Sequence, residues 1–455
     1  MNAVWKFLVA LALLSLVPFS YAENPDFEAS GRALVTQLAA RQFDKAEAQF
    51  DDQMKAGLPL SKLPEVWDSI LAQTGPFKAI TSVKVMEKLG LHAAFVTCEF
   101  ERMALDAQVY MDDRGTVKGL FFGPPAADGA QAAPSTEWKT PAYVNTDAFH
   151  DRDTTIISGR WQLPGVLTVP NSKTAVPAVV LVHGSGPRDA DETIGANKPF
   201  ADLAYGLASQ NVAVLRYVKR TRQYGADSKS DAPFTVKDEV TDDVIAAVSL
   251  LSKMPEINKK QIYVLGHSLG GMLAPRIAAE DPQVAGIIIL AGTARPIEKV
   301  VVEQVKYIAS LTATPAPENK KQIDRAEAIE AQVESPSLKP NEVVDFFGAP
   351  IPGSYFLDLR SYDPAKVAAG LKIPILVLQG GHDYQVTNAD YEVWQKALAG
   401  DPHAAFKFYP NYTHLFMPGA GSGPANPDDY AVPGNVSADV ITDIAKWIKA
   451  NAAAH

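Results

Sequence analysis

The segment whose residues most clearly suggest chemistry is 266–270, which reads G-H-S-L-G. Ser268 stands at the centre of this G-x-S-x-G pattern, after the apolar run 262–265 and before a stretch with helical spacing. The two glycines permit a sharp turn from strand to helix that would hold the serine hydroxyl above the edge of a sheet. A helix behind the turn would offer unpaired N–H groups and the positive end of its dipole. The pattern predicts that Ser268 is a nucleophile for acyl transfer, and the alternative is a glycine-rich turn with an idle serine.

A serine nucleophile needs a base and an acid, and both can be placed by their order in the chain. Serine is weakly nucleophilic until a base removes its proton, and in this arrangement an acid and then a histidine follow the serine. Asp383 fits the acid, because it lies on the turn after the strand-like run 373–379. His414 fits the base, because it lies in the loop after the next strand-like run, 406–409. The predicted triad is Ser268, Asp383 and His414.

Other acidic residues and histidines fit these roles less well. Asp390 and Asp401 remain alternatives for the acid, although both lie on or beside a predicted helix rather than at a strand end. The other histidines that follow the serine come before the acid, before the last strand or in the C-terminal tail; they are His382, His403 and His455.

Acyl transfer also needs hydrogen-bond donors aimed at the oxyanion that develops in the transition state. The backbone N–H of Leu269, directly after the nucleophile, should be one donor. The second should come from the loop after an earlier strand, and residues 182–187, V-H-G-S-G-P, form such a loop. We expect the backbone N–H of Ser185 to be that donor. For His183 we prefer a structural role in supporting the loop over a catalytic one.

The elements that must position these residues extend from about residue 150 to the C-terminus. Short apolar, β-branched runs alternate there with helical stretches, which is typical of a mostly parallel sheet covered by helices on both faces. Strand-like runs lie at 177–182, 212–216, 261–265, 284–290, 373–379 and 406–409. Between residues 291 and 364 the alternation gives way to Ala-, Glu- and Lys-rich helical segments broken by prolines. We predict a helical cap at about 295–360, over the sheet edge where α/β proteins bind ligands.

The part of the chain before this region divides into three segments. Residues 1–22 carry one positive charge, an apolar run and S-Y-A before Glu23, the form of a cleaved secretory signal peptide. A membrane anchor is the alternative, but it needs about 20 apolar residues and this run is shorter. We therefore expect a periplasmic or secreted protein. Residues 23–124 show helical spacing over 26–55 and then period-two strands, which predicts a small α+β domain.

A linker and the large domain complete the predicted organisation. Residues 125–148 are rich in Pro, Ala, Gly and Ser and are interpreted as a linker. Residues 149–455 form the α/β domain with its cap. The single cysteine, Cys98, lies in an alternating apolar run, which favours a buried strand thiol over a nucleophile.

Composition excludes several classes of protein. Hydrophobic residues make up 47% and charged residues 21%, close to the averages for soluble globular chains. The net charge of −10 argues against a nucleic-acid partner, which needs clustered Lys and Arg. The chain has no H-E-x-x-H and no P-loop motif, so we expect neither a metal nor a cofactor. No later run is long and apolar enough to span a membrane, and nothing in the sequence indicates an oligomeric state.

With these residues in view, 150–455 resembles the α/β-hydrolase superfamily. Within it, the chain is similar to the EstD-like bacterial carboxylesterases, which also carry a small domain before the hydrolase fold. In this chain, the order of elements in the small domain resembles the cone-shaped NTF2-like domains. The similar segments are 183–187 with Asp189, Asp191 and Glu192, then 355–364, 381–386 and 409–416. The resemblance implies hydrolysis of short-chain carboxylic esters through an acyl-enzyme on Ser268, with Asp383 and His414 completing the triad. Two positions depart from the usual family pattern, Ala190 in place of Arg and Val218 in place of Asp.

Two other functions remain open at the level of sequence. A peptidase or acyl-transfer enzyme could use the same triad, because the acyl-enzyme step is shared and the pocket decides the substrate. A non-catalytic binding protein could keep the fold, although such proteins commonly lose a member of the triad. The expected partner is a small-molecule ester.

Overall fold

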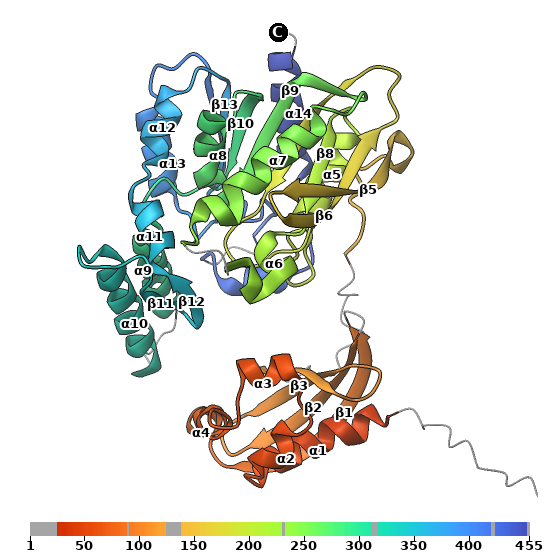
Figure 1. Cartoon of the computed structure of the whole chain (residues 1–455), viewed down its shortest axis with the longest axis vertical. Helices are drawn as coiled ribbons and strands as arrows, with labels where there is room; N and C mark the ends of the chain where they lie inside the picture. The colour runs from red at the N-terminus through yellow and green to blue at the C-terminus, as the bar shows by residue number, and fades with distance from the viewer. Residues whose placement is uncertain are drawn as a thin grey trace, which may run out of the picture. The chain divides into compact units, whose positions relative to one another are not determined.

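The computed structural model describes residues 25–88, 91–123, 138–229, 233–311, 317–419 and 424–452. The chain forms two compact units, Met1–Ala132 and Ala133–His455, and each is described by itself (Figure 1). The predicted signal peptide, residues 1–22, lies outside the described residues, as do residues 125–137 of the predicted linker. No helix within the described segments is long and apolar enough to cross a bilayer.

The smaller unit has helices first and a four-stranded antiparallel sheet after them, as the sequence predicts. Its helices are α1 (Phe27–Ala39), α2 (Phe43–Glu47), α3 (Asp52–Gly57) and α4 (Leu63–Thr74). Its strands, each paired with the next along the chain, are β1 (Phe77–Lys88), β2 (Leu91–Phe100), β3 (Ala104–Met111) and β4 (Val117–Gly123). Cys98 lies in the apolar core of this unit, and burial raises the pKa of its thiol to about 12. Cys98 is therefore the unreactive strand thiol that the sequence favours.

The helical spacing over residues 26–55 belongs to three helices and not to one continuous helix. The backbone between α2 and α3 pairs with the sheet: the N–H of Val117 donates to the carbonyl of Gln49 at 2.8 Å, and the N–H of Asp51 donates to the carbonyl of Val117 at 3.1 Å. These groups cannot also serve a helix, so the helical run must break there. The Asp51 side chain then caps α3 by accepting the N–H of Met54.

The larger unit is built on one eight-stranded sheet in the order β14-β13-β10-β9-β7-β8-β6-β5. Six strands run parallel: β7 (Val176–Val182), β8 (Ala213–Tyr217), β9 (Ile257–His267), β10 (Val284–Leu290), β13 (Ile375–Gly380) and β14 (Ala404–Tyr409). At one edge β6 (Trp161–Pro170) is antiparallel to β8, and β5 (Phe149–Ser158) is antiparallel to β6. The mostly parallel sheet that the sequence predicts is confirmed.

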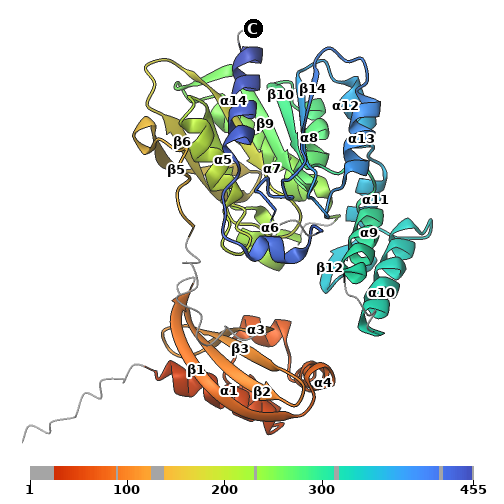
Figure 2. The ribbon, with the colours of Figure 1, turned by 180° about the vertical axis from the view of Figure 1, so that it is seen from behind.

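Helices cover both faces of this sheet. Alternate side chains of the central strands pack against α5 (Pro199–Ala208) and α14 (Ala438–Ala452), the face toward the viewer in Figure 2. The other face, toward the viewer in Figure 1, packs against α7 (Asp242–Leu251), α8 (Leu269–Glu280), α12 (Pro364–Gly370) and α13 (Asn388–Ala397). Short helical turns complete the unit: η1 (Thr146–Ala148), α6 (Arg220–Tyr224), η2 (Gly225–Lys229), the π-helical η3 (Lys237–Thr241) and η4 (Pro427–Ala431). Burial on both faces explains why the strands are apolar without alternation.

The region between β10 and β13 contains helices, as predicted, and also a β-hairpin that the sequence analysis did not predict. Its elements are α9 (Ile297–Ser310), α10 (Pro317–Glu334), β11 (Val343–Phe346), β12 (Ala349–Pro352) and α11 (Gly353–Arg360). The hairpin turns at Phe347 and Gly348, whose φ angles are 54° and 94°. Asp345 stabilises this turn, because its Oδ1 accepts the N–H of Gly348 at 2.7 Å. We call residues 295–360 the cap.

The described end of the predicted linker packs on the larger unit. Nε1 of Trp138 donates to Oδ1 of Asp202 at 2.8 Å, and the hydroxyl of Tyr143 donates to the carbonyl of Val436 at 2.8 Å. Asp202 is buried at α5, so this contact anchors the start of the unit to the helix layer.

Candidate active site

Ser268 lies at the sharp turn between β9 and α8, and its backbone is strained. Its φ is 55° and its ψ is −117°, which few non-glycine residues adopt. The flanking glycines are required for space: a Cβ at Gly266 would lie 2.0 Å from the carbonyl oxygen of Gly270. The N–H of Ser268 donates to the carbonyl of Leu290 on β10 at 3.0 Å, which holds the turn to the sheet. Strain of this kind persists only where the surroundings enforce it, and it is common at functional sites.

The structure brings Asp383 and His414 together from neighbouring strands. Asp383 follows β13, His414 follows β14, and both side chains are buried. Nδ1 of His414 lies 2.7 Å from Oδ2 of Asp383. The other oxygen, Oδ1, accepts the N–H of Gln385 at 2.8 Å and that of Val386 at 3.0 Å. Because a carboxylate only accepts, Nδ1 carries the imidazole proton and Nε2 of the neutral ring is left as an acceptor.

The alternative acids have structural roles elsewhere. Asp390 is fully buried, its Oδ2 lies 2.9 Å from Nη2 of Arg295, and its Oδ1 accepts the hydroxyl of Thr293 at 2.7 Å. Asp401 caps a turn by accepting the N–H of His403 at 2.9 Å. Neither carboxylate contacts His414 in the described structure.

The structure describes two of the three alternative histidines, and neither has a hydrogen bond to Asp383 or His414. Nε2 of His382 lies 3.3 Å from Oδ2 of Asp429. His403 lies on the turn of Asp401, and His455 is outside the described residues.

His267 and Glu192 connect the loops that carry the candidate residues. Nδ1 of His267 lies 2.8 Å from Oε2 of Glu192, and Nε2 of His267 donates to the carbonyl of His414 at 3.0 Å. The other oxygen of Glu192 accepts the N–H of Gly184 at 2.6 Å. The rings of His267 and His414 have centroids 4.6 Å apart, so His414 lies beside the residue that precedes Ser268. One buried pair thus joins the glycine-rich loop, the serine turn and the histidine loop.

The electrostatics of this pair favour an ion pair. Burial alone would raise the pKa of Glu192, but the charge of His267 and the hydrogen bonds to it lower that pKa to about 2. Burial alone would lower the pKa of His267, and the opposing effect of Glu192 raises it above its ordinary value. A protonated His267 donates from both ring nitrogens, as the two contacts require. The sequence does not predict the contact between His267 and Glu192. The only signals are that Glu192 lies in a segment resembling the family and that His267 lies inside the serine motif.

The glycine-rich loop runs beside the serine. A Cβ at Gly184 would lie 3.2 Å from Cβ of Ser268. Among the described residues the N–H of Ser185 has no hydrogen-bond partner. Leu269 is the first residue of α8, where N–H groups have no acceptor within the helix. The two N–H groups that the sequence analysis selected are therefore both available to a ligand.

His183 has the surroundings of a structural residue. Its ring packs on Phe200 and Tyr217, with both centroids 5.0 Å away, and its Nε2 donates to the carbonyl of Asp189 at 2.9 Å. Burial lowers its pKa to about 4, so the ring is neutral at ordinary pH. These contacts support the role that the sequence analysis prefers, a support for the loop.

A cavity of about 520 Å³ separates the glycine-rich loop from the cap. Ser185, Gly186 and Pro187 line one side. The cap lines the other with mostly apolar side chains: Ile297, Phe346, Ala349, Pro350, Ile351, Tyr355 and Phe356. The cap therefore borders a cavity at the loop that carries the Ser185 N–H.

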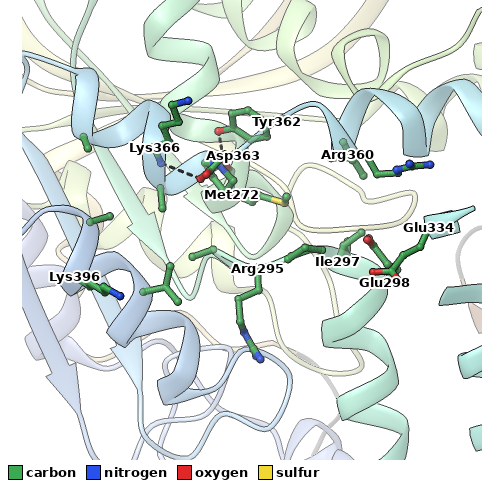
Figure 3. A pocket seen from close by; sticks show the side chains of 18 residues that line it. Met272, Arg295, Ile297, Glu298, Glu334, Arg360, Tyr362, Asp363, Lys366 and Lys396 are labelled. Atoms are coloured by element: carbon green, nitrogen blue, oxygen red, sulfur yellow. Dashed lines mark hydrogen bonds between the residues drawn. The ribbon is translucent and has the colours of Figure 1, made fainter. Parts of the chain in front are cut away.

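A larger hollow, of about 990 Å³, lies elsewhere in this unit (Figure 3). It is bordered by charged side chains such as Arg295, Arg360, Lys366 and Lys396, which point in different directions in Figure 3. No residue of the predicted triad lines either hollow, but Ser185 of the glycine-rich loop lines the smaller one and not the larger one. Size alone therefore does not identify the reactive site in this fold.

Comparison with known families agrees with this architecture. Residues 175–418, more than half of the chain, match the family described as "Serine aminopeptidase, S33". Residues 32–120 of the smaller unit match a family described as "Protein of unknown function (DUF3887)". The doubly covered sheet and the strained serine turn define the larger unit as an α/β hydrolase.

One relative matches nearly the whole chain. Esterase EstD of Thermotoga maritima is 37% identical over 422 residues, which cover 93% of this chain and 95% of the relative. The chain therefore belongs to the EstD-like esterases.

Two solved structures are similar at low identity. Est1E from Butyrivibrio proteoclasticus is 16% identical with a TM-score of 0.43, covering 66% of this chain and 99% of that one. The esterase domain of a Rhodothermus marinus protein is 19% identical with a TM-score of 0.40, covering 66% and 98%.

Proposed function

We propose that this protein is an exported serine carboxylesterase that hydrolyses short-chain esters through an acyl-enzyme on Ser268. The observation that carries the proposal is the hydrogen bond of 2.7 Å between His414 and Asp383, next to the strained turn of Ser268. The relationship to Esterase EstD supports an ester as the substrate. The segment 1–22, with its apolar run and small residues before Glu23, supports export.

In the proposed reaction, each residue has one task. Oγ of Ser268 attacks the ester carbonyl while Nε2 of His414 takes the proton of the serine hydroxyl. The resulting oxyanion accepts hydrogen bonds from the N–H groups of Ser185 and Leu269. The C–O bond to the alcohol then breaks, and the alcohol leaves with the proton from His414. Water attacks the acyl-enzyme in the same way, giving the carboxylic acid and free Ser268. Asp383 keeps the imidazole oriented and stabilises its positive charge.

The cavity of about 520 Å³ suits the acyl group of a small ester. Its walls are mostly apolar, so each buried methylene should contribute about 0.8 kcal/mol until the space is full. Because the cap closes one side, the cavity has finite depth. The resemblance to the EstD-like carboxylesterases implies acyl chains of roughly two to six carbons, and a cavity of finite depth is compatible with that preference.

An aminopeptidase is the second candidate, because the family that matches residues 175–418 carries that description. An aminopeptidase must bind a free ammonium group, and Glu239 is a carboxylate that lines the cavity. Both of its oxygens are already occupied: Oε1 lies 2.9 Å from Nζ of Lys219, and Oε2 accepts the hydroxyl of Tyr355 at 2.7 Å. This arrangement favours the ester substrate.

Kinetics with matched substrates test the proposal. We expect hydrolysis of p-nitrophenyl butyrate, and little or no hydrolysis of alanine p-nitroanilide, with either a free or a blocked amine. Ser268→Ala should lower kcat for the ester by orders of magnitude while its thermal unfolding changes little. Faster hydrolysis of the free-amine anilide than of the ester would establish the peptidase instead. Absence of all hydrolysis in the correctly folded wild type would favour a binding protein.

A further inference from the structure

The peptide bond between Gly184 and Ser185 is held by a buried lysine. Nζ of Lys219 donates to the carbonyl oxygen of Gly184 at 2.9 Å, and the lysine is 1% exposed. In a planar trans peptide the carbonyl and the following N–H point in opposite directions. A lysine that fixes the direction of the Gly184 carbonyl therefore also fixes the direction of the Ser185 N–H.

We propose that Lys219 is a positioning residue of the oxyanion hole, which holds this peptide in the orientation that aims the Ser185 N–H at the oxyanion on Ser268. The inference rests on the proposed function, in which that N–H is one of two donors. Lys219 does not touch the substrate in this scheme. It acts through the peptide, and its ammonium group also polarises the carbonyl, which makes the N–H of the same unit a better donor.

The loop needs an external clamp, because its own backbone does not hold it. Among the described residues the hydrogen bonds of Gly184 and Ser185 run to side chains: Oε1 of Glu192 accepts the Gly184 N–H at 2.6 Å, and Nε of Arg188 donates to the Ser185 carbonyl at 3.1 Å. Glycine at position 184 permits peptide rotations that a residue with a Cβ would resist. Lys219 is the donor that holds the carbonyl of the peptide carrying the Ser185 N–H.

Glu239 lies beside the buried lysine as its counter-charge. Its Oε1 lies 2.9 Å from Nζ of Lys219, and its Oε2 accepts the hydroxyl of Tyr355. Burial would raise the pKa of Glu239, but the charge of Lys219 and the hydrogen bonds from Tyr355 and Lys219 lower it below its ordinary value. A charged donor forms a stronger hydrogen bond to a carbonyl than a neutral one. Because Tyr355 lies on α11 of the cap, this network also joins the cap to the loop.

The competing explanation is that Lys219 only neutralises Glu239 and so stabilises the fold. The two explanations differ in what a variant does to the transition state. Loss of a clamp should weaken binding of an oxyanion and leave binding of the neutral substrate almost unchanged. Loss of a structural ion pair should lower the melting temperature without a selective effect on the oxyanion.

The test is the double variant Lys219→Met with Glu239→Gln in the full chain, which removes both charges and leaves Tyr355 an amide oxygen as acceptor. With p-nitrophenyl butyrate, kcat should fall about 10- to 100-fold with KM within about twofold, less than the ~10²–10³ that loss of a whole donor costs. Affinity for a propyl trifluoromethyl ketone, which forms an oxyanion on the serine, should fall by the same factor as kcat/KM.

The matched control is Arg220→Met with Asp243→Asn, which removes the neighbouring buried ion pair. Among the described residues the hydrogen bonds of Arg220 run to Asp243 and Ser158 and not to the glycine-rich loop. The control should lower the melting temperature but keep kcat and ketone affinity within about threefold of wild type.

Each outcome has one meaning. A folded Lys219 double variant with kcat and ketone affinity near wild type overturns the inference, as does an equal kinetic loss in the control. If the double variant does not fold, the single variant Lys219→Gln is tested, because it keeps a neutral donor on a shorter side chain. We then expect kcat and ketone affinity to fall in parallel. A fall in melting temperature alone overturns the inference. Failure of a fluorophosphonate to label Ser268 in the wild type contradicts the proposed function, whereas a labelled wild type with an unaffected double variant contradicts only the role of Lys219.

Discussion

Replacing Asp383 by asparagine should remove activity by reversing the tautomer of His414. The side-chain amide introduced by Asp383→Asn has one acceptor and one donor group, and the structure decides which way they point. The oxygen must occupy the Oδ1 position, because the N–H groups of Gln385 and Val386 donate there at 2.8 Å and 3.0 Å. The NH₂ group is then forced to face Nδ1 of His414, which lies 2.7 Å from Oδ2 in the native protein.

This forced orientation sets the expected magnitude. Nδ1 must accept from the amide, so the imidazole proton moves to Nε2, and Nε2 can no longer take the proton of Ser268. The same tautomer error in a serine protease lowers kcat about 10⁴-fold. At 1.36 kcal/mol for each factor of ten, that corresponds to ~5 kcal/mol of lost transition-state stabilisation. The fold should be nearly unaffected, because the new side chain has the same size and keeps the backbone hydrogen bonds at the Oδ1 position.

The assay compares Asp383→Asn with Asp390→Asn, the alternative acid. Both variants are measured for kcat on p-nitrophenyl butyrate and for thermal unfolding. The Asp390 variant should keep most of its kcat while folded and lose melting temperature, because it weakens the contact with Arg295. The reasoning is refuted if Asp383→Asn retains more than about a tenth of the wild-type kcat, or if only Asp390→Asn removes activity.

Further outcomes follow from other features of the structure. Gly266→Ala should prevent correct folding of the larger unit, because its Cβ would lie 2.0 Å from the Gly270 carbonyl oxygen; normal expression and melting temperature would contradict this. The ion pair of His267 and Glu192 should make stability depend on pH. The raised pKa of His267 gives stability that is complete below its ordinary value of 6.5 and lost as pH rises through the folded value. The pKa of Glu192, lowered to about 2, gives stability that is present above its ordinary value of 4.5 and lost as pH falls toward 2. His267→Gln should therefore remove a decline in melting temperature above about pH 6.5, and an unchanged profile would show that the pair is not charged. In a series of p-nitrophenyl esters below micelle formation, kcat/KM should peak at roughly two to six carbons, and a maximum at about twelve or longer would favour a lipase. Protein purified from the exported fraction should begin at Glu23 within a few residues, and an intact Met1 there would contradict a cleaved signal.

Much of the fold could be predicted, and candidates for the triad could be selected, because their signals are local. Ser268 is marked by two glycines that the turn requires, and Asp383 and His414 each follow an apolar strand. The two-sided burial of the sheet makes those strands continuous apolar runs, which are easy to recognise. Chain order then selects one acid and one histidine from several.

The contacts that connect these residues could not be predicted, because they depend on the path of loops. Glu192 and His267 are 75 residues apart, and Lys219 and Gly184 are 35 apart, with a side chain bonded to a backbone carbonyl in the second case. No spacing rule identifies such pairs. The hairpin in the cap was missed because its turn uses Phe347 at positive φ, where a glycine or asparagine would have given a signal.

The most direct test of the central claim is to find which residue carries the covalent intermediate. The wild type and Ser268→Ala are treated with a fluorophosphonate, digested and mapped by mass spectrometry. We expect one phosphonyl group per chain, on the peptide that contains residues 266–270, and none on the Ser268→Ala protein. Labelling of a different serine, or equal labelling of the Ser268→Ala protein, would contradict it.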